Sequence, residues 1–236
     1  MEIYCDFDGT ITQQDVIDLL LERLADPSWQ DIETRWIEGE IGSRECLSQQ
    51  IPLINGGWEA IDNLLREVKS DPSFKSFSIW CERKEIPLFI VSEGLQNAIK
   101  SLLGKEDIRV KKIWSNRLEL SENGKFTLLF PYPPNSKNCN LGLCKCQILE
   151  QSTNTGLKIV IGDGLNDICW TQKANLVFAK SKLLKHCELN NIPCIPFENF
   201  NEVTSALDKI LRGDLTVISG ELVKNPVKEN LNVRRS

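Results

Sequence analysis

The chain has 236 residues, with 28 Lys and Arg against 33 Asp and Glu, so its net charge is −5. Its 41% hydrophobic content is that of a globular protein, and a chain this long buries a core without disulfide or metal support. The mild acidity argues against a duplex nucleic-acid binder, which needs a basic face to neutralise phosphates. A single histidine disfavours catalytic triads and histidine-rich zinc sites. Chemistry is therefore expected from carboxylate, lysine, serine or cysteine side chains.

No basic leader followed by a long apolar stretch is visible at the N-terminus. The purest apolar run, 88–91, is far too short to span a membrane. Nine cysteines without a signal sequence indicate reduced thiols. We therefore expect a cytoplasmic protein without a membrane or nucleic-acid partner, acting as a monomer or homodimer.

The first third of the chain combines one short strand with a helical insert. Residues 2–5 predict a strand that leads directly into Asp6-Phe-Asp-Gly-Thr10. Apolar residues then recur at helical spacing over 16–24. Three further helices are expected near 28–38, 43–54 and 58–69. No strand pattern occurs between Thr12 and Ile86, so 13–70 predicts a small helical bundle.

From residue 71 onward, strands and helices alternate. The continuous apolar runs 86–91 and 157–161 are typical of strands buried on both faces. Further strands are expected near 108–114, 174–179 and 193–197, and a hairpin around Glu-Asn-Gly at 122–124. Helices are expected near 71–84, 94–103, 144–151, 180–189 and 202–211. The alternation predicts an α/β fold with a Rossmann-like parallel sheet covered by helices on both faces.

These elements predict three parts of the chain. Residues 1–12 and 71–212 are expected to form the core, and 13–70 a helical cap inserted after the first strand. The segment 213–236 shows no hydrophobic period and is expected to be a flexible tail.

Acidic residues follow two of the predicted buried strands. Asp6 and Asp8 come directly after the first strand, and Asp163 and Asp167 come after the strand at 157–161. The carboxyl ends of parallel strands share one edge of the sheet, where ligands bind. Carboxylates gathered there repel one another unless a cation intervenes. Oxygen ligands alone favour a hard ion, and Mg²⁺ is the natural candidate. An isolated Asp-x-Asp pattern is common on surfaces, so its place after a strand is what favours a metal site.

Two further positions suit a phosphate group. Ser92-Glu93-Gly94 is expected to join a strand end to a helix N-terminus, where free N–H groups favour an anion. Taken alone, Ser92 is equally consistent with an ordinary helix cap. Lys145, at the expected start of another helix, could supply a positive charge, although a lone lysine is more often solvated. The ordered combination with the acidic residues is what predicts phosphate chemistry.

Taken in order, Asp6–Thr10, Ser92, Lys145 and 162–167 resemble the four motifs of the haloacid-dehalogenase (HAD) superfamily phosphatases. The resemblance extends from residue 1 to about 212. The position of the helical insert is similar to that of the phosphoserine-phosphatase-like branch. The resemblance implies a Mg²⁺-dependent phosphatase in which Asp6 becomes an aspartyl-phosphate. Asp8 would protonate the leaving alkoxide and then activate water.

The resemblance also implies the ligands of the metal and the phosphate. Mg²⁺ would be held by the Asp6 carboxylate, the Asp8 backbone carbonyl and Asp163, with Asp167 in or beside the coordination shell. The phosphoryl oxygens would be held by Ser92, Glu93, Gly94 and Lys145. Two rival functions stay open: a phosphotransferase that passes the phosphoryl group to an alcohol, and a catalytically idle HAD fold used for binding.

Substrate choice rests on weaker similarities. Ser115-Asn116, Gly124-Lys125 and 195–200 resemble the methionine-salvage phosphatases of this branch, which act on 2-hydroxy-3-keto-5-methylthiopentenyl 1-phosphate. Phosphoserine phosphatases use an early acid and a cap arginine to hold the amino acid. Asp15 stands at the position of that acid, whereas Ser48 or Gln50 aligns with the arginine, leaving Arg44 as the substitute. The salvage substrate is therefore favoured, with phosphoserine or a related metabolite as the alternative.

Two groups of residues carry no assigned role. Trp29, Trp36 and Trp58 could line a wall for a thioether chain, or simply pack inside the cap. Cys139, Cys144 and Cys146 are spaced closely enough to suggest a structural metal, but no second cysteine pair lies at zinc-finger spacing. Buried thiols are the favoured interpretation.

Overall fold

The computed structural model of the protein describes residues 1–135 and 139–224. At its centre lies a seven-stranded sheet in the order β4-β3-β2-β1-β5-β6-β7. Neighbouring strands run parallel except for β3 and β4, which are antiparallel. The strands are β1 (Glu2–Cys5), β2 (Leu88–Leu95), β3 (Lys112–Leu120), β4 (Phe126–Leu129), β5 (Lys158–Gly162), β6 (Leu176–Ala179) and β7 (Ile195–Pro196). The predicted parallel α/β sheet and the hairpin at 122–124 are confirmed.

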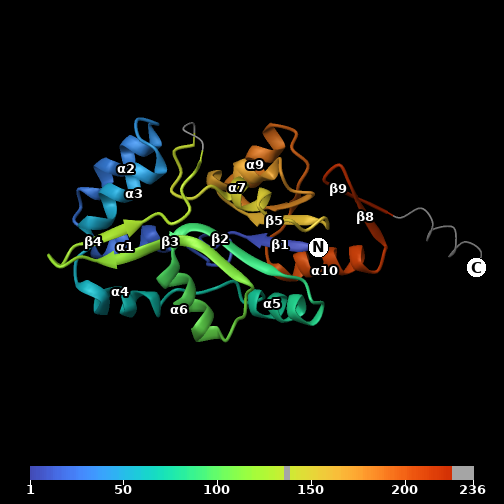
Figure 1. The fold of residues 1–236 in the computed structure, drawn as a ribbon, viewed down its shortest axis with the longest axis horizontal. Coiled ribbons are helices and arrows are strands. Elements are labelled where there is room, and N and C mark those ends of the chain that lie inside the picture. The colour runs from blue at the N-terminus through green and yellow to red at the C-terminus, as the bar shows by residue number, and fades with distance from the viewer. Residues whose placement is uncertain (136–138, 225–236) are drawn as a thin grey trace, which may run out of the picture.

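Helices cover both faces of this sheet. In Figure 1, α5, α6 and α10 lie on one side of the sheet, and α7 and α9 lie on the other. The helices that follow residue 71 are α5 (Phe74–Arg83), α6 (Gln96–Glu106), α7 (Lys145–Glu150), α8 (Ile168–Thr171), α9 (Ser181–Leu189) and α10 (Phe200–Leu211), with a 3-10 turn η2 (Leu165–Asp167) before α8. The molecule therefore has the three-layer arrangement expected from alternating strands and helices.

The core follows from the two-residue period of the strands. In β1, Ile3 and Cys5 face one apolar cluster, whereas Tyr4 faces the other. In β5, Val160 joins the second cluster while its neighbours join the first. Because side chains alternate across a strand, a run of consecutive apolar residues serves both faces. This is why the buried strands are recognisable from the sequence.

In residues 13–70, here called the cap segment, the regular elements are all helices, with isolated β-bridges at Ser70 and between Ala25 and Ile54. The helices are α1 (Val16–Leu24), α2 (Trp29–Ile37), α3 (Ser43–Gln50), the 3-10 turn η1 (Ile51–Leu53) and α4 (Gly57–Leu65). The carboxylate of Asp15 caps α1 by accepting hydrogen bonds from the amides of Ile17 and Asp18. The ring of Trp58 meets the fully buried Phe126 of β4 edge to face, with centroids 5.1 Å apart. The cap segment is therefore packed against the antiparallel edge of the sheet.

The prediction that Ser92-Glu93-Gly94 opens a helix is wrong. Strand β2 continues to Leu95 and α6 begins only at Gln96. The register between β2 and β3 shifts between Val91 and Leu95. The amide of Gly94 donates to Ser92 Oγ at 2.8 Å. This local bond holds the irregular strand end, so Ser92 belongs to a bulged strand and does not cap a helix.

The prediction of a flexible tail from residue 213 is wrong for the part that the structure describes. Strands β8 (Leu215–Ile218) and β9 (Glu221–Lys224) form an antiparallel hairpin. Ser219 and Gly220 both have positive φ, as the favoured two-residue hairpin turns require. Val217 and Leu222 pack against the core. Residues 225–236 of the predicted tail lie outside the described residues. In the described chain, no helix combines the length and apolar character that crossing a membrane requires.

Candidate active site

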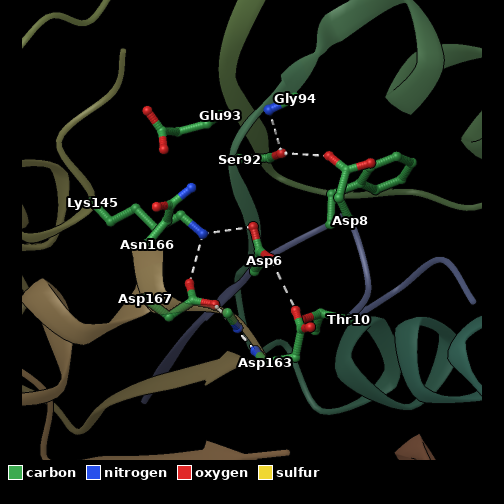
Figure 2. A network of polar contacts seen from close by, with 12 residues as sticks. Asp6, Asp8, Thr10, Ser92, Glu93, Gly94, Lys145, Asp163, Asn166 and Asp167 are labelled. Atoms are coloured by element: carbon green, nitrogen blue, oxygen red, sulfur yellow. Dashed lines mark hydrogen bonds and ion pairs between the residues drawn. The ribbon is translucent and has the colours of Figure 1, made fainter. Parts of the chain in front are cut away.

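The predicted site residues arrive at one edge of the sheet from separate elements. Asp6 follows β1, Ser92 lies near the end of β2, Lys145 begins α7 and Asp163 follows β5. Because β1 lies between β2 and β5, the carboxyl ends of these three strands are adjacent. Figure 2 shows the side chains meeting there. This is the position at which parallel α/β sheets bind ligands.

Lys145 is the centre of a buried ion-pair network. Its Nζ lies 2.6 Å from Asp6 Oδ1 and 2.6 Å from Asp167 Oδ1, and only 2% of the lysine is exposed. Burial by itself disfavours the lysine charge, but the two carboxylates outweigh it and raise the pKa of Lys145. Burial and the neighbouring Asp167 raise the pKa of Asp6 despite the lysine. The network fixes Asp6 through Oδ1, while Oδ2 receives only a 3.5 Å contact from Thr10.

Asp6, Asp163 and Asp167 form a group with the chemistry of a metal site. Each offers a carboxylate oxygen, and these atoms all lie within 4.8 Å of one another. Asp167 Oδ2 accepts from the amides of Asp163 and Gly164 at 3.1 and 3.0 Å, so its orientation is set by the backbone. Burial raises the pKa of Asp163, and the like charge of Asp167 adds to the increase. An all-oxygen donor set of this kind fits a hard divalent ion.

Small residues make room for this group. Gly9 has φ +71°, and a Cβ there would lie 2.6 Å from Asp163 Oδ2. A Cβ on Gly162 would lie 2.5 Å from Asp167 Oδ2. Thr10 donates to Asp163 Oδ1 at 2.8 Å. This orienting role was not predicted, although the threonine lies inside the first motif and a fully buried hydroxyl there requires a partner.

The Asp8 side chain is not part of this acidic group and lies beside Ser92 (Figure 2). Its Oδ2 accepts from Ser92 Oγ at 3.2 Å, and its Oδ1 accepts from the amide of Val16 at 3.0 Å. Burial and then the nearby Asp15 raise the pKa of Asp8 to about 8. A carboxyl group that keeps its proton near neutral pH is suited to general acid catalysis. A side chain on Gly94 would collide with this carboxylate.

Glu93 points away from Asp8 (Figure 2), because neighbouring side chains alternate along a strand. Its carboxylate accepts from Ser43 Oγ and from the amides of Gly142 and Leu143. Burial raises the pKa of Glu93. The predicted phosphate-binding group therefore divides: Ser92, Gly94 and Lys145 surround the site, whereas the Glu93 carboxylate is committed to protein donors. The partner Ser43 was not predicted, because it is 50 residues away and no local pattern marks it.

A cavity of about 490 Å³ lies over these groups. Its lining includes the sheet-edge residues Asp6, Asp8, Ser92, Glu93, Gly94, Lys145, Asp163 and Asp167, the cap residues Asp15, Ile17, Asp18, Glu33, Trp36, Ser43, Leu47 and Gln50 (here called the cap wall), and Lys182 of α9. This volume suits a small metabolite.

The structure brings only one of the two predicted specificity residues to the cavity. Asp15 lines it, and removal of its carboxyl from bulk water raises the pKa of Asp15. Arg44 is absent from the lining; its guanidinium carbon lies 5.0 Å from the centre of the Phe130 ring. Among the three tryptophans, Trp36 lines the cavity, whereas Trp29 and Trp58 pack against the core.

The cysteines of the 139–146 stretch form a thiol cluster beside the site. Cys144 Sγ and Cys146 Sγ are 3.3 Å apart, and all three thiols, including Cys139, are free. Burial raises their pKa values. Within the described residues the acidic group is the only set of three or more ligands close enough to share a metal. Cys144 is buried, whereas Cys139 and Cys146 are half-buried, so the predicted buried thiol applies to Cys144 alone.

Comparison with known proteins shows the family. Residues 2–182 match a family model described as "Putative Phosphatase". The 2-hydroxy-3-keto-5-methylthiopentenyl-1-phosphate phosphatases of Bacillus cereus strain ATCC 10987 and of Bacillus anthracis are each 31% identical over 215 residues, covering 89% of this chain and 97% of theirs. The chain belongs to the HAD-superfamily phosphatases, in the phosphoserine-phosphatase-like branch. It is a phosphoric monoester hydrolase.

Solved structures of this branch have the same fold. A substrate-bound phosphoserine phosphatase superposes with a TM-score of 0.65 at 21% identity, covering 86% of this chain and 96% of that chain. A probable phosphoserine phosphatase from Vibrio cholerae gives a TM-score of 0.69 at 16% identity, covering 92% and 67%. At these identities the likeness concerns the fold alone. The predicted family and α/β architecture are confirmed.

Proposed function

We propose that this HAD phosphatase uses Asp6 as nucleophile, Asp8 as acid and base, and Mg²⁺ as cofactor to hydrolyse 2-hydroxy-3-keto-5-methylthiopentenyl 1-phosphate or a close relative. The observation that carries the proposal is that polar side chains from distant parts of the sequence converge on one cavity. Asp6, Ser92, Lys145 and Asp163 come from four separate elements and line one cavity of about 490 Å³. Four polar groups are brought to one point without an evident structural need, which favours a catalytic role.

In the first half of the reaction, Asp6 attacks the phosphorus through a carboxylate oxygen. The new acyl-phosphate bond forms as the ester P–O bond breaks, and the leaving alkoxide takes the proton of Asp8. Lys145 supports this step because its Nζ, 2.6 Å from Asp6 Oδ1, places a positive charge where the phosphoryl oxygens gather. Ser92 contributes a hydroxyl on the opposite side.

In the second half, Asp8 is ionised and accepts a proton from a water molecule. The water oxygen attacks the phosphorus, the acyl-phosphate bond breaks, and orthophosphate and the free Asp6 carboxylate result. The pKa of about 8 for Asp8 supports its proposed first role as a proton donor at neutral pH. Because no step requires an imidazole, the scheme agrees with a chain that contains one histidine.

The acidic group supports a divalent cofactor. Asp6, Asp163 and Asp167 would hold Mg²⁺, whose charge neutralises the phosphoryl oxygens when it is bound. Lys145 balances one of the three carboxylate charges, so the group keeps a net negative charge that favours a cation. The main-chain carbonyl of Asp8 stays a predicted ligand, by resemblance.

The cap wall favours the salvage substrate over phosphoserine. Ile17, Trp36 and Leu47 offer an apolar surface for a methylthio chain. Phosphoserine would bring an ammonium group, which the acids of the same wall would attract, together with a carboxylate, which they would repel. Arg44, the residue predicted to pair with that carboxylate, lies over Phe130 instead. We therefore propose that residues 13–70 act as the specificity cap, without Arg44 as a substrate ligand.

A panel of phosphorylated metabolites assayed with Mg²⁺ tests the proposal. It should include the salvage substrate, phosphoserine and a generic aryl phosphate, with kcat/KM as the readout. We expect the salvage substrate to exceed phosphoserine by at least about 10²-fold, the size of a missing charged contact. Equal or better turnover of phosphoserine would contradict the substrate assignment. Added acceptor alcohols should leave phosphate release equal to substrate loss; a phosphotransferase would release less phosphate.

A further inference from the structure

Glu93 is a buried acid that the proposed reaction does not use. Only 7% of the residue is exposed. Ser43 Oγ lies 3.3 and 3.2 Å from its two carboxylate oxygens, and the amides of Gly142 and Leu143 donate to Oε1 at 2.5 and 3.4 Å. Among residues 1–135 and 139–224 it has no ion pair. Burying a carboxylate without a countercharge is costly. The burial of Glu93 among three donors therefore requires an explanation.

These donors belong to two segments that are far apart in the sequence. Ser43 is the first residue of α3 in the cap segment, and Gly142 and Leu143 lie immediately before Cys144 and Lys145. The Glu93 carboxylate therefore bridges the cap segment and the chain that presents Lys145.

The same two segments touch at a second place. The amide of Arg44 donates to the carbonyl of Asn140 at 3.1 Å. A Cβ on Gly42 would lie 2.9 Å from that carbonyl oxygen, so the two backbones are in close contact. The guanidinium of Arg44 covers Phe130, which precedes this loop. Residues 42–44 and 140–143 thus form one continuous contact, with Glu93 beneath it.

Strand β2 connects this contact to the reacting groups. Ser92 reaches Asp8 on one side, and Glu93 reaches the segment before Lys145 on the other (Figure 2). The main-chain carbonyl of Glu93 also accepts from the buried Asn116 side chain at 2.5 Å, which fixes the strand end against β3. A change in the Glu93 side chain would therefore affect the cap wall and Lys145, with its partner Asp6, together, while Asp163 keeps its own bond from Thr10.

We propose that Glu93 is a positioning residue that ties the cap segment to the Lys145 loop and so holds both in the arrangement needed for turnover; this rests on the proposed function. Glu93 also lines the cavity, but its carboxylate accepts from Ser43, Gly142 and Leu143, so we assign it to positioning.

Three variants separate the two links. Glu93→Ala removes both, and we expect kcat to fall by about 10²-fold, as for a displacement of about 1 Å at the reacting groups, with KM raised as well. Glu93→Gln keeps one acceptor oxygen and should recover most of kcat. Ser43→Ala removes the cap link only, so KM should rise several-fold while kcat stays near wild type.

Glu2→Ala is the matched control. Glu2 is equally buried, accepts from Tyr4 and Ser152, and lies at the opposite end of β1. Its loss should lower the unfolding temperature without changing kcat or KM. If Glu93→Ala and Glu2→Ala have the same kinetics, or if Glu93→Gln rescues nothing while Ser43→Ala is silent, the positioning role is wrong.

A structural readout makes the test independent of the substrate. Amide hydrogen exchange should accelerate in peptides covering both 41–50 and 140–150 in Glu93→Ala, and in 41–50 alone in Ser43→Ala. Unchanged exchange in both peptides would overturn the proposed tie even if activity fell. An inactive wild type with accelerated exchange in the variant would instead contradict the proposed function and leave the tie intact.

Discussion

Two groups of carboxylates face the same cavity, and they are built differently. At the sheet edge, Asp6 and Asp167 lie 2.6 Å from the buried Lys145, and backbone amides orient Asp167. On the cap wall, Asp15, Asp18 and Glu33 have no ion pair within the described residues. Asp15 accepts from helix amides and Glu33 from Gln50.

The difference separates chemistry from recognition. Strand ends hold the first group rigidly, so its charges are preorganised for a cation and a phosphoryl group. The cap acids sit on helices, and burial together with Asp15 and Glu33 raises the pKa of Asp18 to about 7. The charge of Asp18 therefore changes within the physiological pH range. We therefore expect any substitution at the sheet edge to reduce activity. Substitutions on the cap wall should mainly change which substrate groups are accepted.

The largest effect is expected at the nucleophile. Asp6→Asn should lower kcat by at least about 10³-fold, because an amide cannot form the acyl-phosphate. The fold should persist, since Asp167 still pairs with Lys145. Steady-state phosphate release and thermal unfolding measure the two outcomes. Appreciable activity in a folded Asp6→Asn protein would refute Asp6 as the nucleophile.

Metal removal is expected to have a comparable effect through the same carboxylate group. Treatment with EDTA should reduce phosphate release to background, because Lys145 alone balances only one of the three neighbouring carboxylate charges. Excess Mg²⁺ should restore the activity, whereas Ca²⁺, with its longer bonds and looser geometry, should restore less. Full activity in the presence of chelator would remove the metal from the scheme.

The acid and base is expected to contribute the next largest effect. Asp8→Asn should reduce kcat by about 10²–10⁴-fold. The loss should be smaller for aryl phosphates, whose leaving groups need no proton. Single-turnover experiments with radiolabelled phosphate should then reveal a slowly decaying phosphoenzyme. If kcat fell equally for all leaving groups and no phosphoenzyme accumulated, the result would argue against Asp8 as the proton donor.

Two glycines near the acidic group offer a finer test of preorganisation. In Gly162→Ala the new Cβ would lie 2.5 Å from Asp167 Oδ2, so this carboxylate must move. In Gly164→Ala the nearest atom is 3.8 Å away, which is ordinary contact. The Mg²⁺ concentration for half-maximal activity should rise about 10–100-fold in the first variant and stay unchanged in the second. Equal half-maximal Mg²⁺ concentrations in the two variants would show that the position of the Asp167 carboxylate is not critical for Mg²⁺ binding.

The smallest effect is expected on the cap wall, and it concerns stability. A folded-state pKa of about 7 for Asp18 lies above its unfolded value, so ionisation costs the folded state more. The free energy of unfolding should therefore fall as pH rises from about 4 to about 7, and Asp18→Asn should reduce this fall. Asp31→Asn, an exposed acid in the first turn of α2, is the control. If the wild type and Asp18→Asn had identical pH profiles of the unfolding temperature, the raised pKa of Asp18 would be contradicted.

The sequence predicted the sheet edge better than the cap. Asp6 and Asp163 follow buried apolar strands and Ser92 lies near the end of another, and parallel topology then brings the strand ends together. The strand bulge at 92–94 was missed because hydrophobic periodicity carries no information about register. The hairpin after Gly213 was also missed, although Ser219-Gly220 is a recognisable turn pair.

Contacts between distant segments account for the remaining differences. The bond from Ser43 to Glu93 and the place of Arg44 over Phe130 depend on how the cap segment meets the core. Neither the sequence of α3 nor that of the loop before Lys145 contains a local pattern that predicts this contact between the cap segment and the core. The direction of a long side chain such as arginine is decided by tertiary packing, so its role as a substrate ligand was the least secure prediction.

The edge-to-face contact between Trp58 and Phe126 has a mechanical consequence. It fastens α4 to the antiparallel edge of the sheet, and Phe126 is fully buried. Movement of α4 away from β4 would expose both rings to water. It would also break the ring contact, which stabilises the fold by about 0.5–1.5 kcal/mol beyond the contribution of buried apolar area. Movement of the cap segment away from the sheet is therefore opposed by this contact at α4 as well as by the bonds at residues 42–44.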